Sequence, residues 1–469
     1  MREYINRMLF VIPLIFSQQA MAVLRLPALI GDRAVLQRDM VIPIWGWGDP
    51  REKVSVEFNN KVYGTVVGTD GRWKLQLDIQ KSGGPYRMTL KGDQNTIVLN
   101  DILIGDVFVC SGQSNMERGI DRKLYAEDYK ASVNDQIRQF KVNRQNSDTV
   151  CADIPLHTGW KSASPSTLGN FSAVAYFFAN ALYQKLKVPI GVINTSYGSS
   201  LAEAWISREG LKDFPTFYTQ PKSKTVQSNP MELYNAMLAP ITAFAIKGVV
   251  WYQGEYNAKR AYQYRSLLPA LITDWREKFK NAKLPFIIVQ LPNYNKPVDV
   301  PQESTVAELR EAQAMATALP YTAVVTTIDI NSTEDIHPIE KKPIGIRSAL
   351  AADKLIYGSK VLVTGPTYQS HTVKGSKILV KFDNVGGGLL STDGEVLKYF
   401  TIAGPQKKFV NAKAVILNNN TVEVSNVDIK EPAAVRYAWA DNPQRVNFFN
   451  RDGFPAAPFR TDNWQGVTK

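Results

Sequence analysis

Hydrophobic and polar residues alternate along short segments of the first part of the chain. Turn-forming pairs such as Asp70-Gly71 separate the clearest of these segments, which are 41–45, 53–58 and 72–77. Alternation with a period of two is typical of strands that bury one face. Residues 23–103 are therefore expected to form an N-terminal antiparallel β-sandwich domain.

In the middle of the chain, strand-like segments alternate with helical ones. The strand-like segments are 106–110, 188–195, 247–253, 285–291 and 322–330, and the helical ones include 262–280, 304–318 and the apolar stripe Val174, Phe177, Phe178, Ala181, Leu182 and Leu186. This order predicts an α/β domain over 104–357, with a parallel sheet covered by helices and functional residues at the carboxyl ends of the strands. From residue 358 the pattern is again β, so 358–469 is expected to form a C-terminal β-rich domain.

The first 22 residues have the pattern of a signal peptide. Arg2 and Arg7 precede or border an apolar run from Met8 to Phe16, and Ala20-Met21-Ala22 has the small-x-small form of a cleavage site. The apolar run is far shorter than the ~20 residues that span a bilayer. We expect cleavage near Ala22, no membrane span, and a protein that is secreted or periplasmic.

The composition limits the class of protein and the kinds of binding partner to be expected. A hydrophobic share of 44% with 21% charged residues is that of an ordinary globular protein and excludes collagen-like, coiled-coil and wholly disordered chains. The net charge is +12, but the Lys and Arg residues are spread along the chain. Because nucleic-acid binding requires clustered basic residues, we expect no nucleic-acid partner.

Cysteine and histidine are scarce. The two cysteines, Cys110 and Cys151, provide at most one disulfide and no Cys-rich metal site. The three histidines are His157, His337 and His371. We expect structural or exposed roles for His157, in an irregular stretch, and for His371, whereas His337 follows a predicted strand and two carboxylates precede it.

A nucleophile candidate follows the first strand of the α/β domain. Ser114 lies in Gly112-Gln113-Ser114-Asn115-Met116, directly after the apolar run that ends at Cys110. A serine on a tight turn at the end of a buried strand is held at the edge of the sheet, where backbone N–H groups can face a developing oxyanion. The alternative is that Ser111 or Ser114 only caps a helix.

Four ordered blocks carry a resemblance to a known family. They are Gly112–Met116, Asn194–Gly198 with Ala202–Trp205, Trp251–Glu255, and Asp335–Pro338. In this order they resemble the blocks of SGNH-type hydrolases, and more closely those of the sialate O-acetylesterase family of carbohydrate esterases. The resemblance extends over essentially the whole mature chain. It implies a three-layer α/β/α SGNH-hydrolase-like catalytic domain and a carbohydrate O-acetylesterase.

The resemblance also implies a mechanism. Ser114 would attack the acetyl carbonyl, His337 would act as general base and then as general acid, and Asp335 would orient His337. Backbone N–H groups of Ser114 and Gly198 would form the oxyanion hole together with a side-chain amide from the third block. No metal and no cofactor would be required.

Two assignments stay open at this point. The third-block amide is either Gln253, at the end of its strand, or Asn257; Gln253 is preferred. The orienting acid is expected to be Asp335, although the usual Asp-x-x-His spacing would place Glu334 three residues before His337. Backbone carbonyls are a further way to orient the imidazole.

Other residues have simpler interpretations. Trp251 and Tyr252 are expected in the core of their strand rather than on a sugar-binding face. Glu203 and Glu255 could be a glycosidase pair, but that interpretation leaves Ser114 and His337 without a role. Glu255 is expected to hydrogen-bond the loop that carries Gln253 and Asn257.

The family resemblance suggests the substrate, whereas the residues of the four blocks do not specify it. We expect an O-acetylated sugar or glycan as partner, O-acetyl sialic acid first, with acetylxylan or xyloglucan as the alternative and a glycan-binding protein without activity as a third reading. A substrate with a carboxylate calls for an arginine near the site. The blocks hold none, and the candidates nearby are Arg118, Arg208 and Arg260.

Overall fold

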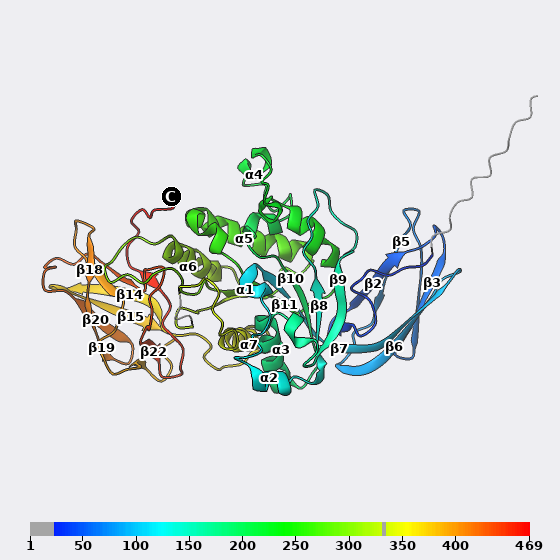
Figure 1. The fold of residues 1–469 in the computed structure, drawn as a ribbon, viewed down its shortest axis with the longest axis horizontal. Helices are drawn as coiled ribbons and strands as arrows, with labels where there is room; N and C mark the ends of the chain where they lie inside the picture. Colours follow the sequence, from blue (N-terminus) through cyan, green and yellow to red (C-terminus); the bar gives the residue numbers. More distant parts are fainter. Residues whose placement is uncertain (1–22, 331–333) are drawn as a thin grey trace, which may run out of the picture.

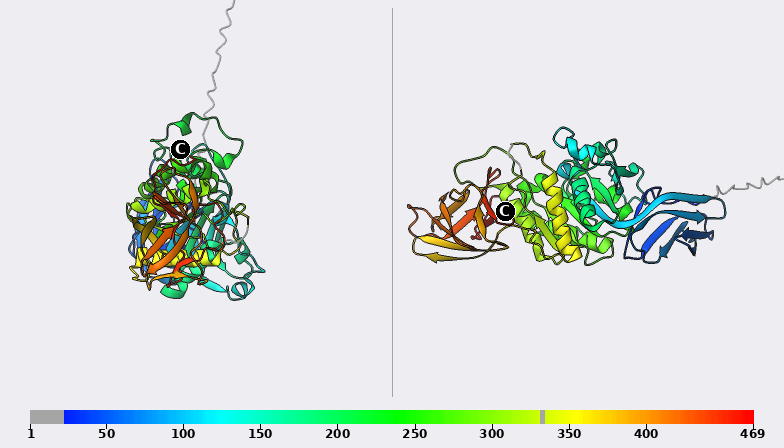
Figure 2. Two further views of the ribbon diagram at one scale, coloured as in Figure 1. Left: turned by 90° about the vertical axis from the view of Figure 1, so that its left-hand side faces the viewer. Right: turned by 90° about the horizontal axis from the view of Figure 1, so that it is seen from below.

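The computed structural model describes residues 23–330 and 334–469. The predicted signal peptide, residues 1–22, lies outside the described residues. Strands occupy both ends of the elongated molecule, and a sheet covered by helices lies between them (Figure 1). The view from below shows the same three parts in a row (Figure 2).

Seven strands build the N-terminal part. They are β1 (Val35–Gln37), β2 (Ile42–Trp47), β3 (Lys53–Phe58), β4 (Lys61–Val66), β5 (Arg72–Leu77), β6 (Gly83–Lys91) and β7 (Thr96–Gly112). β2 pairs with β5, and β3 pairs with β4 and β6, all antiparallel, as predicted. The long strand β7 pairs with β6 here and then continues into the central sheet. The predicted boundary after residue 103 therefore falls inside one continuous strand.

The central sheet has the strand order β13-β12-β11-β7-β10-β8-β9. Its further strands are β8 (Asn134–Val142), β9 (His157–Ala163), β10 (Ile190–Ser196), β11 (Gly248–Tyr252), β12 (Phe286–Val289) and β13 (Thr322–Val325). All pairings are parallel except that of β8 with β9. The predicted α/β fold with a parallel sheet is thereby confirmed.

Helices cover both faces of this sheet. The longer ones are α3 (Ala173–Leu186), α5 (Ala261–Lys278), α6 (Thr305–Met315) and α7 (Lys342–Tyr357). Short α-helices lie at Ser114–Glu117 (α1), Ala126–Lys130 (α2) and Thr216–Thr219 (α4). Short 3₁₀ helices lie at Leu168–Asn170, Ala202–Trp205, Val226–Ser228, Ala239–Ile241, Glu255–Arg260 and Ala316–Ala318, and a π-helical turn lies at Tyr234–Leu238.

Alternate residues of the central strands belong to two different cores. In β11, Val249 and Trp251 pack with α5, whereas Val250 and Tyr252 pack with α3 and α7. Both aromatic residues are fully buried, which confirms their predicted place in the core. The strand thus buries side chains on both faces, as expected for a parallel sheet between two helix layers.

Ten strands form the C-terminal part. They are β14 (Thr367–Lys374), β15 (Lys377–Asp383), β16 (Leu389–Ser391), β17 (Phe400–Ala403), β18 (Phe409–Asn411), β19 (Lys413–Asn418), β20 (Thr421–Ser425), β21 (Ala434–Tyr437), β22 (Phe448–Asn450) and β23 (Phe459–Arg460). They make two four-stranded antiparallel sheets and one short pair around a separate apolar core. This agrees with the β structure predicted after residue 358.

Two features differ from the sequence-based expectation. His157 does not lie in an irregular stretch but begins β9, next to β8, which was not predicted either. The pattern of β8 is unusual because Arg138 and Gln139 are buried within it. In addition, β13 ends at Val325 rather than continuing to residue 330.

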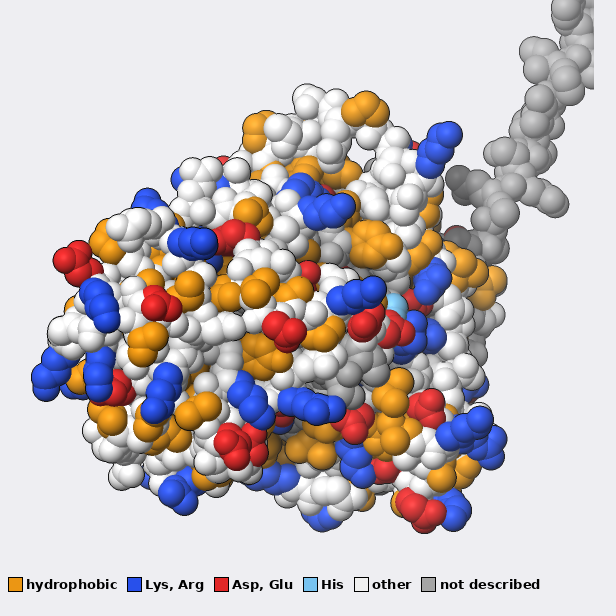
Figure 3. Space-filling view, turned by 60° about the vertical axis from the view of Figure 1, so that its left-hand side comes forward, with side chains coloured by type: hydrophobic (Ala, Val, Ile, Leu, Met, Phe, Trp, Pro, Cys, Tyr) orange, Lys and Arg blue, Asp and Glu red, His pale blue; other side chains and the backbone are white. Residues whose placement is uncertain are grey.

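The surface agrees with the scattered charge in the sequence. On the face drawn in Figure 3, basic side chains are interspersed with acidic ones over the whole surface. Within the described ranges, no helix combines the length and the apolar character that crossing a bilayer requires.

Both cysteines are free, and burial raises the pKa of the Cys110 thiol far above its ordinary value.

Candidate active site

Ser114 is the first residue of α1, directly after the carboxyl end of β7. The turn depends on Gly112, whose φ is +137° and where a Cβ would lie 2.1 Å from the carbonyl oxygen of Tyr252. No other residue fits this close approach of two strands. The backbone therefore lifts Ser114 to the edge of the central sheet, where the sequence placed it.

His337 contacts the Ser114 hydroxyl. The distance from His337 Nε2 to Ser114 Oγ is 2.9 Å, although 223 residues separate the two. The His337 side chain is 19% exposed, so substrate can reach it from solvent. A hydroxyl and an imidazole at this distance form the arrangement that lets a base remove the proton of a nucleophile.

Asp335 holds the other side of the imidazole. Its Oδ1 lies 2.9 Å from His337 Nδ1 and also accepts the backbone N–H of His337 at 2.9 Å. Glu334 is exposed, and its backbone carbonyl accepts the N–H of Asn295. Of the two acids left open by the sequence, Asp335 is thus the one on the ring.

The electrostatics keep the imidazole neutral. Burial lowers the pKa of His337 below 6.5, and the positive charge of Arg118 lowers it further, while Asp335 opposes both. Partial burial alone would raise the pKa of Asp335, but hydrogen bonds from His337 outweigh it and the pKa is lowered. At neutral pH a neutral base therefore faces Ser114 and an ionised carboxylate lies behind it.

Arg118 contacts the same ring nitrogen as Asp335. Its Nη2 lies 3.0 Å from His337 Nδ1. One nitrogen cannot both donate to Asp335 and accept from Arg118, so these two side chains favour opposite tautomers. The productive tautomer is the one with the proton on Nδ1, which leaves Nε2 free to accept from Ser114.

Gly198 lies beside Ser114, as the expected oxyanion donor should. A Cβ added at Gly198 would lie 3.5 Å from the Ser114 Cβ. Its N–H, however, already donates to Glu117 Oε2 at 2.9 Å. Arg144 donates two hydrogen bonds to the same carboxylate, at 2.6 and 2.7 Å.

The third-block amides belong to a buried network. Gln253 Nε2 donates to Ser200 O at 3.0 Å and to Asn257 Oδ1 at 2.7 Å. Asn257 Nδ2 donates to Glu203 Oε2 at 3.0 Å. Each amide thus has a protein partner in this structure, and a third oxyanion donor from either residue stays a prediction.

Asn115, the buried residue after Ser114, connects α1 to the loop that carries His337. No pattern in the sequence indicates this role. Asn115 donates to Glu255 Oε1 at 2.6 Å and to the Ile336 carbonyl at 3.0 Å, and it accepts from Lys341 Nζ at 2.5 Å. Burial lowers the pKa of Lys341 to about 7, against the charge of Glu255. Glu255 also hydrogen-bonds the backbone of its own loop.

Other residues named from the sequence lie away from the dyad or have structural partners. Arg260 binds Glu203 Oε1 at 2.5 Å, and Arg208 stacks on the ring of Tyr218. His157 stacks on Phe140, and His371 contacts the Tyr368 hydroxyl at 2.8 Å. Both histidines therefore have the structural roles expected of them. Among the described residues, no group of His, Cys, Asp and Glu side chains could hold a metal ion.

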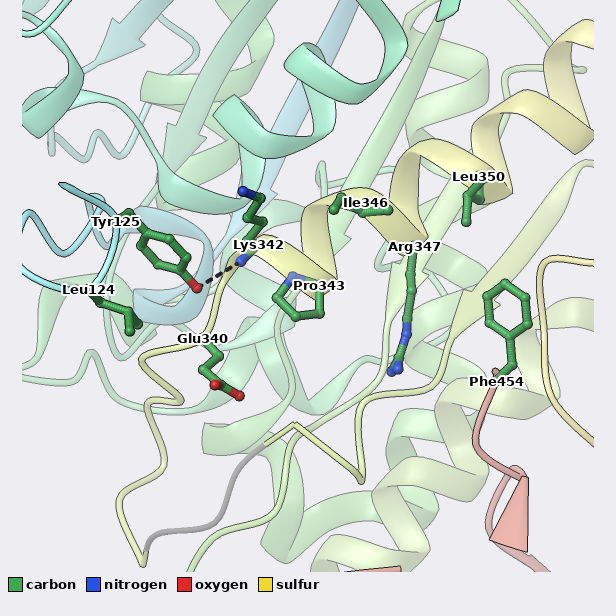
Figure 4. A pocket seen from close by; sticks show the side chains of 9 residues that line it. All are labelled: Leu124, Tyr125, Glu340, Lys342, Pro343, Ile346, Arg347, Leu350 and Phe454. Carbon is green, nitrogen blue, oxygen red and sulfur yellow. Dashed lines mark hydrogen bonds between the residues drawn. The ribbon is translucent and has the colours of Figure 1, made fainter. Parts of the chain in front are cut away.

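A cavity of about 460 Å³ lies along α7, the helix after the His337 loop (Figure 4). Its lining is largely apolar and consists of Leu124, Tyr125, Glu340, Lys342, Pro343, Ile346, Arg347, Leu350 and Phe454. Neither Ser114 nor His337 lines it. The contact between Ser114 and His337 thus lies outside this cavity.

The chain is similar to known carbohydrate esterases over most of its length. Residues 104–351 match the model of a family described as carbohydrate esterase, sialic acid-specific acetylesterase. The chain is 28% identical to sialate O-acetylesterases of Homo sapiens, over 93% of this chain and 92% of that one, and of Mus musculus, over 93% and 94%. A solved structure of a carbohydrate acetylesterase from Xanthomonas citri is 37% identical, covers 94% of this chain and 100% of its own, and superposes with a TM-score of 0.89. The chain therefore belongs to the sialic acid-specific acetylesterases, a family of carbohydrate esterases.

Proposed function

We propose that this carbohydrate O-acetylesterase removes acetyl groups from O-acetylated sialic acids, with Ser114 as nucleophile. The contact of Ser114 Oγ with His337 Nε2, at 2.9 Å, supports the mechanism most strongly. The names of the curated relatives support the substrate. We also infer that the protein is secreted or periplasmic, from the pattern of residues 1–22.

The reaction begins with proton transfer from the Ser114 hydroxyl to His337 Nε2. The serine oxygen attacks the acetyl carbonyl, and the protonated His337 then gives its proton to the sugar oxygen, which leaves as the free hydroxyl. Water attacks the acetyl-serine with His337 again as base, and acetate leaves. Asp335 stabilises the imidazolium that forms twice in this cycle.

The oxyanion formed in each step needs donors beside Ser114. We assign the N–H groups of Ser114 and Gly198 to this role, with Gln253 or Asn257 as the third donor. Loss of one such donor costs on the order of 3 kcal/mol of transition-state stabilisation. In the resting enzyme, the Gly198 N–H must first leave Glu117.

Substitution of either member of the dyad tests the mechanism. Ser114→Ala and His337→Ala are each expected to lower kcat by about a thousandfold or more, because the two side chains act as one unit. The purified variants should keep the thermal midpoint of the wild type within a few degrees. Near-wild-type turnover in either folded variant would refute the assignment.

A substrate comparison tests the sugar. We expect more acetate to be released from O-acetyl sialoglycoconjugates than from acetylated xylooligosaccharides at equal acetyl concentration. An acidic substrate needs a guanidinium near Ser114, and Arg118 and Arg144 both lie next to residues of the site. A strong preference for the neutral oligosaccharide would instead favour a hemicellulose esterase.

A further inference from the structure

Glu117 lies between Gly198 and Arg144 and hydrogen-bonds both. Its carboxylate accepts a hydrogen bond from the Gly198 N–H at 2.9 Å and bidentate hydrogen bonds from Arg144 at 2.6 and 2.7 Å. Arg–carboxylate pairs of this geometry are the strong, directional kind. The enzyme therefore already holds one carboxylate next to its nucleophile before substrate arrives.

This carboxylate conflicts with the chemistry of the site. The Gly198 N–H cannot donate fully to Glu117 and to the acetyl oxygen at once. A carboxylate is a strong acceptor, so Glu117 competes with the acetyl oxygen for the Gly198 N–H. Catalysis thus requires the Glu117 side chain to leave Gly198.

Arg144 is accessible and close to the reacting serine. Its Nη2 lies 3.3 Å, and the Ser114 Cβ 3.5 Å, from the same point, the Cβ position built at Gly198. The Arg144 side chain is 56% exposed, whereas that of Glu117 is 14% exposed. The guanidinium lies over the ring of Tyr197, 5.0 Å from its centroid, which holds it in place.

Arg118 is less suited to bind substrate. It contacts His337 at Nδ1, whereas Ser114 is at Nε2, the other nitrogen of the ring. A ligand on Arg118 would therefore lie behind the imidazole, on the side of Asp335. Arg144 lies on the side of Gly198 and Ser114, where the acetyl ester must bind.

We propose that Arg144 binds the carboxylate of the acidic sugar and that Glu117 fills this position, and holds the Gly198 N–H, until the substrate carboxylate displaces it. One carboxylate replaces another on Arg144, so the charge of the subsite stays balanced. The displaced Glu117 releases Gly198 for the oxyanion. This inference rests on the proposed sialate specificity and adds the residues that would produce it.

The first test concerns Arg144. We expect Arg144→Gln to lower the ratio of kcat/KM for an O-acetyl sialoside to that for 4-nitrophenyl acetate by roughly tenfold or more, since a hydrogen-bonded charge is lost. Arg144→Lys should restore part of the ratio. The control is Arg122→Gln, an exposed arginine on the segment after α1 that stacks on Tyr129 and should leave the ratio unchanged.

The second test concerns Glu117 and needs no sialoside. Glu117→Gln removes the charge from Gly198 and should raise kcat/KM for 4-nitrophenyl acetate several-fold, with little change in the thermal midpoint. A rate equal to or below that of the wild type would overturn the proposal, because Glu117 would then only support the Gly198 loop.

Binding of free sialic acid gives a readout besides turnover. Titration calorimetry should show weaker binding to Arg144→Gln than to the wild type and to Arg122→Gln. If the wild type does not prefer the sialoside, the proposed function fails. If the wild type prefers it and Arg144→Gln keeps both the preference and the affinity, the function stands and the Arg144 subsite is wrong.

Discussion

Arg118 and Asp335 both contact Nδ1 of His337, the proposed base, and they act on its pKa in opposite directions. Asp335 favours the tautomer with the proton on Nδ1, and the charge of Arg118 disfavours the imidazolium. Arg118 lies only four residues after Ser114, so the segment that carries the proposed nucleophile also lowers the pKa of the proposed base. The sequence predicted roles for Ser114, His337 and Asp335, but it did not indicate the contact of Arg118 with His337, because that contact joins residues 219 positions apart.

The pH dependence of the Arg118→Gln variant tests this effect. His337 must be neutral to accept the Ser114 proton, so kcat/KM falls as pH falls through the His337 pKa. Because Arg118 lowers that pKa, its removal should raise the pKa and move the acid limb to higher pH. A pH profile with 4-nitrophenyl acetate measures the shift, with Arg122→Gln as charge control. An acid limb that stays in place or moves to lower pH would contradict this interpretation.

The identity of the orienting acid gives a second residue-scale prediction. Asp335→Asn should lower kcat by at least about tenfold, because the amide can stabilise the wrong tautomer and not the imidazolium. Glu334→Gln, its matched control one residue away, should change kcat by less than about threefold, since its exposed side chain has no contact with the ring. The reverse order would assign the role to Glu334. Small effects in both would leave the task to backbone carbonyls.

At the scale of secondary-structure elements, the candidate active site lies at the carboxyl ends of strands and in the segments that follow them. Ser114 follows β7 and Gly198 follows β10, and apolar runs in the sequence predict both strands. The polar contacts between those segments were not visible. Asn115 joins the third block to the His337 loop through Glu255 and Ile336, and nothing in local pattern indicates partners 140 and 221 residues away. β8 was missed because a buried Arg138 breaks its apolar pattern.

Asn115→Ala tests how much the hydrogen bonds of Asn115 contribute to the free energy of unfolding. The substitution leaves the buried Glu255 and Lys341 without their shared partner, so we expect the free energy of unfolding to fall by about 2–4 kcal/mol. Urea denaturation measures it. Asn100→Ala, at an exposed position, should stay within about 0.5 kcal/mol of the wild type. A loss that small in Asn115→Ala would show that the buried pair does not depend on Asn115.

At the scale of the whole molecule, one shared strand and a buried arginine join the three parts. β7 belongs to both the N-terminal sheet and the central one. Arg310 of α6 is fully buried and donates to the carbonyls of Ala440 and Asp441 in the C-terminal part, at 2.7 and 2.9 Å. The alternation of patterns predicted β, α/β and again β structure in this order along the chain. It could not predict these joints, because a buried guanidinium in a helix has no signature distinct from an exposed one.

Arg310→Met should therefore weaken the attachment of the C-terminal part. It leaves several buried carbonyls without donors and is expected to lower the free energy of unfolding by about 3 kcal/mol or more. Urea denaturation of the full chain provides the measurement, and Arg87→Met, an exposed arginine of β6, is the control. Equal stability of the two variants would mean that the joint contributes little.

The acetyl-enzyme is the most direct test of the mechanism. The wild type is mixed with 4-nitrophenyl acetate, quenched in acid within the first turnover, digested and analysed by mass spectrometry. We predict a single acetyl group on the peptide that contains Ser114, absent when Ser114→Ala is treated in the same way. Acetylation of a different residue in the wild type, or steady acetate release from Ser114→Ala, would contradict the account.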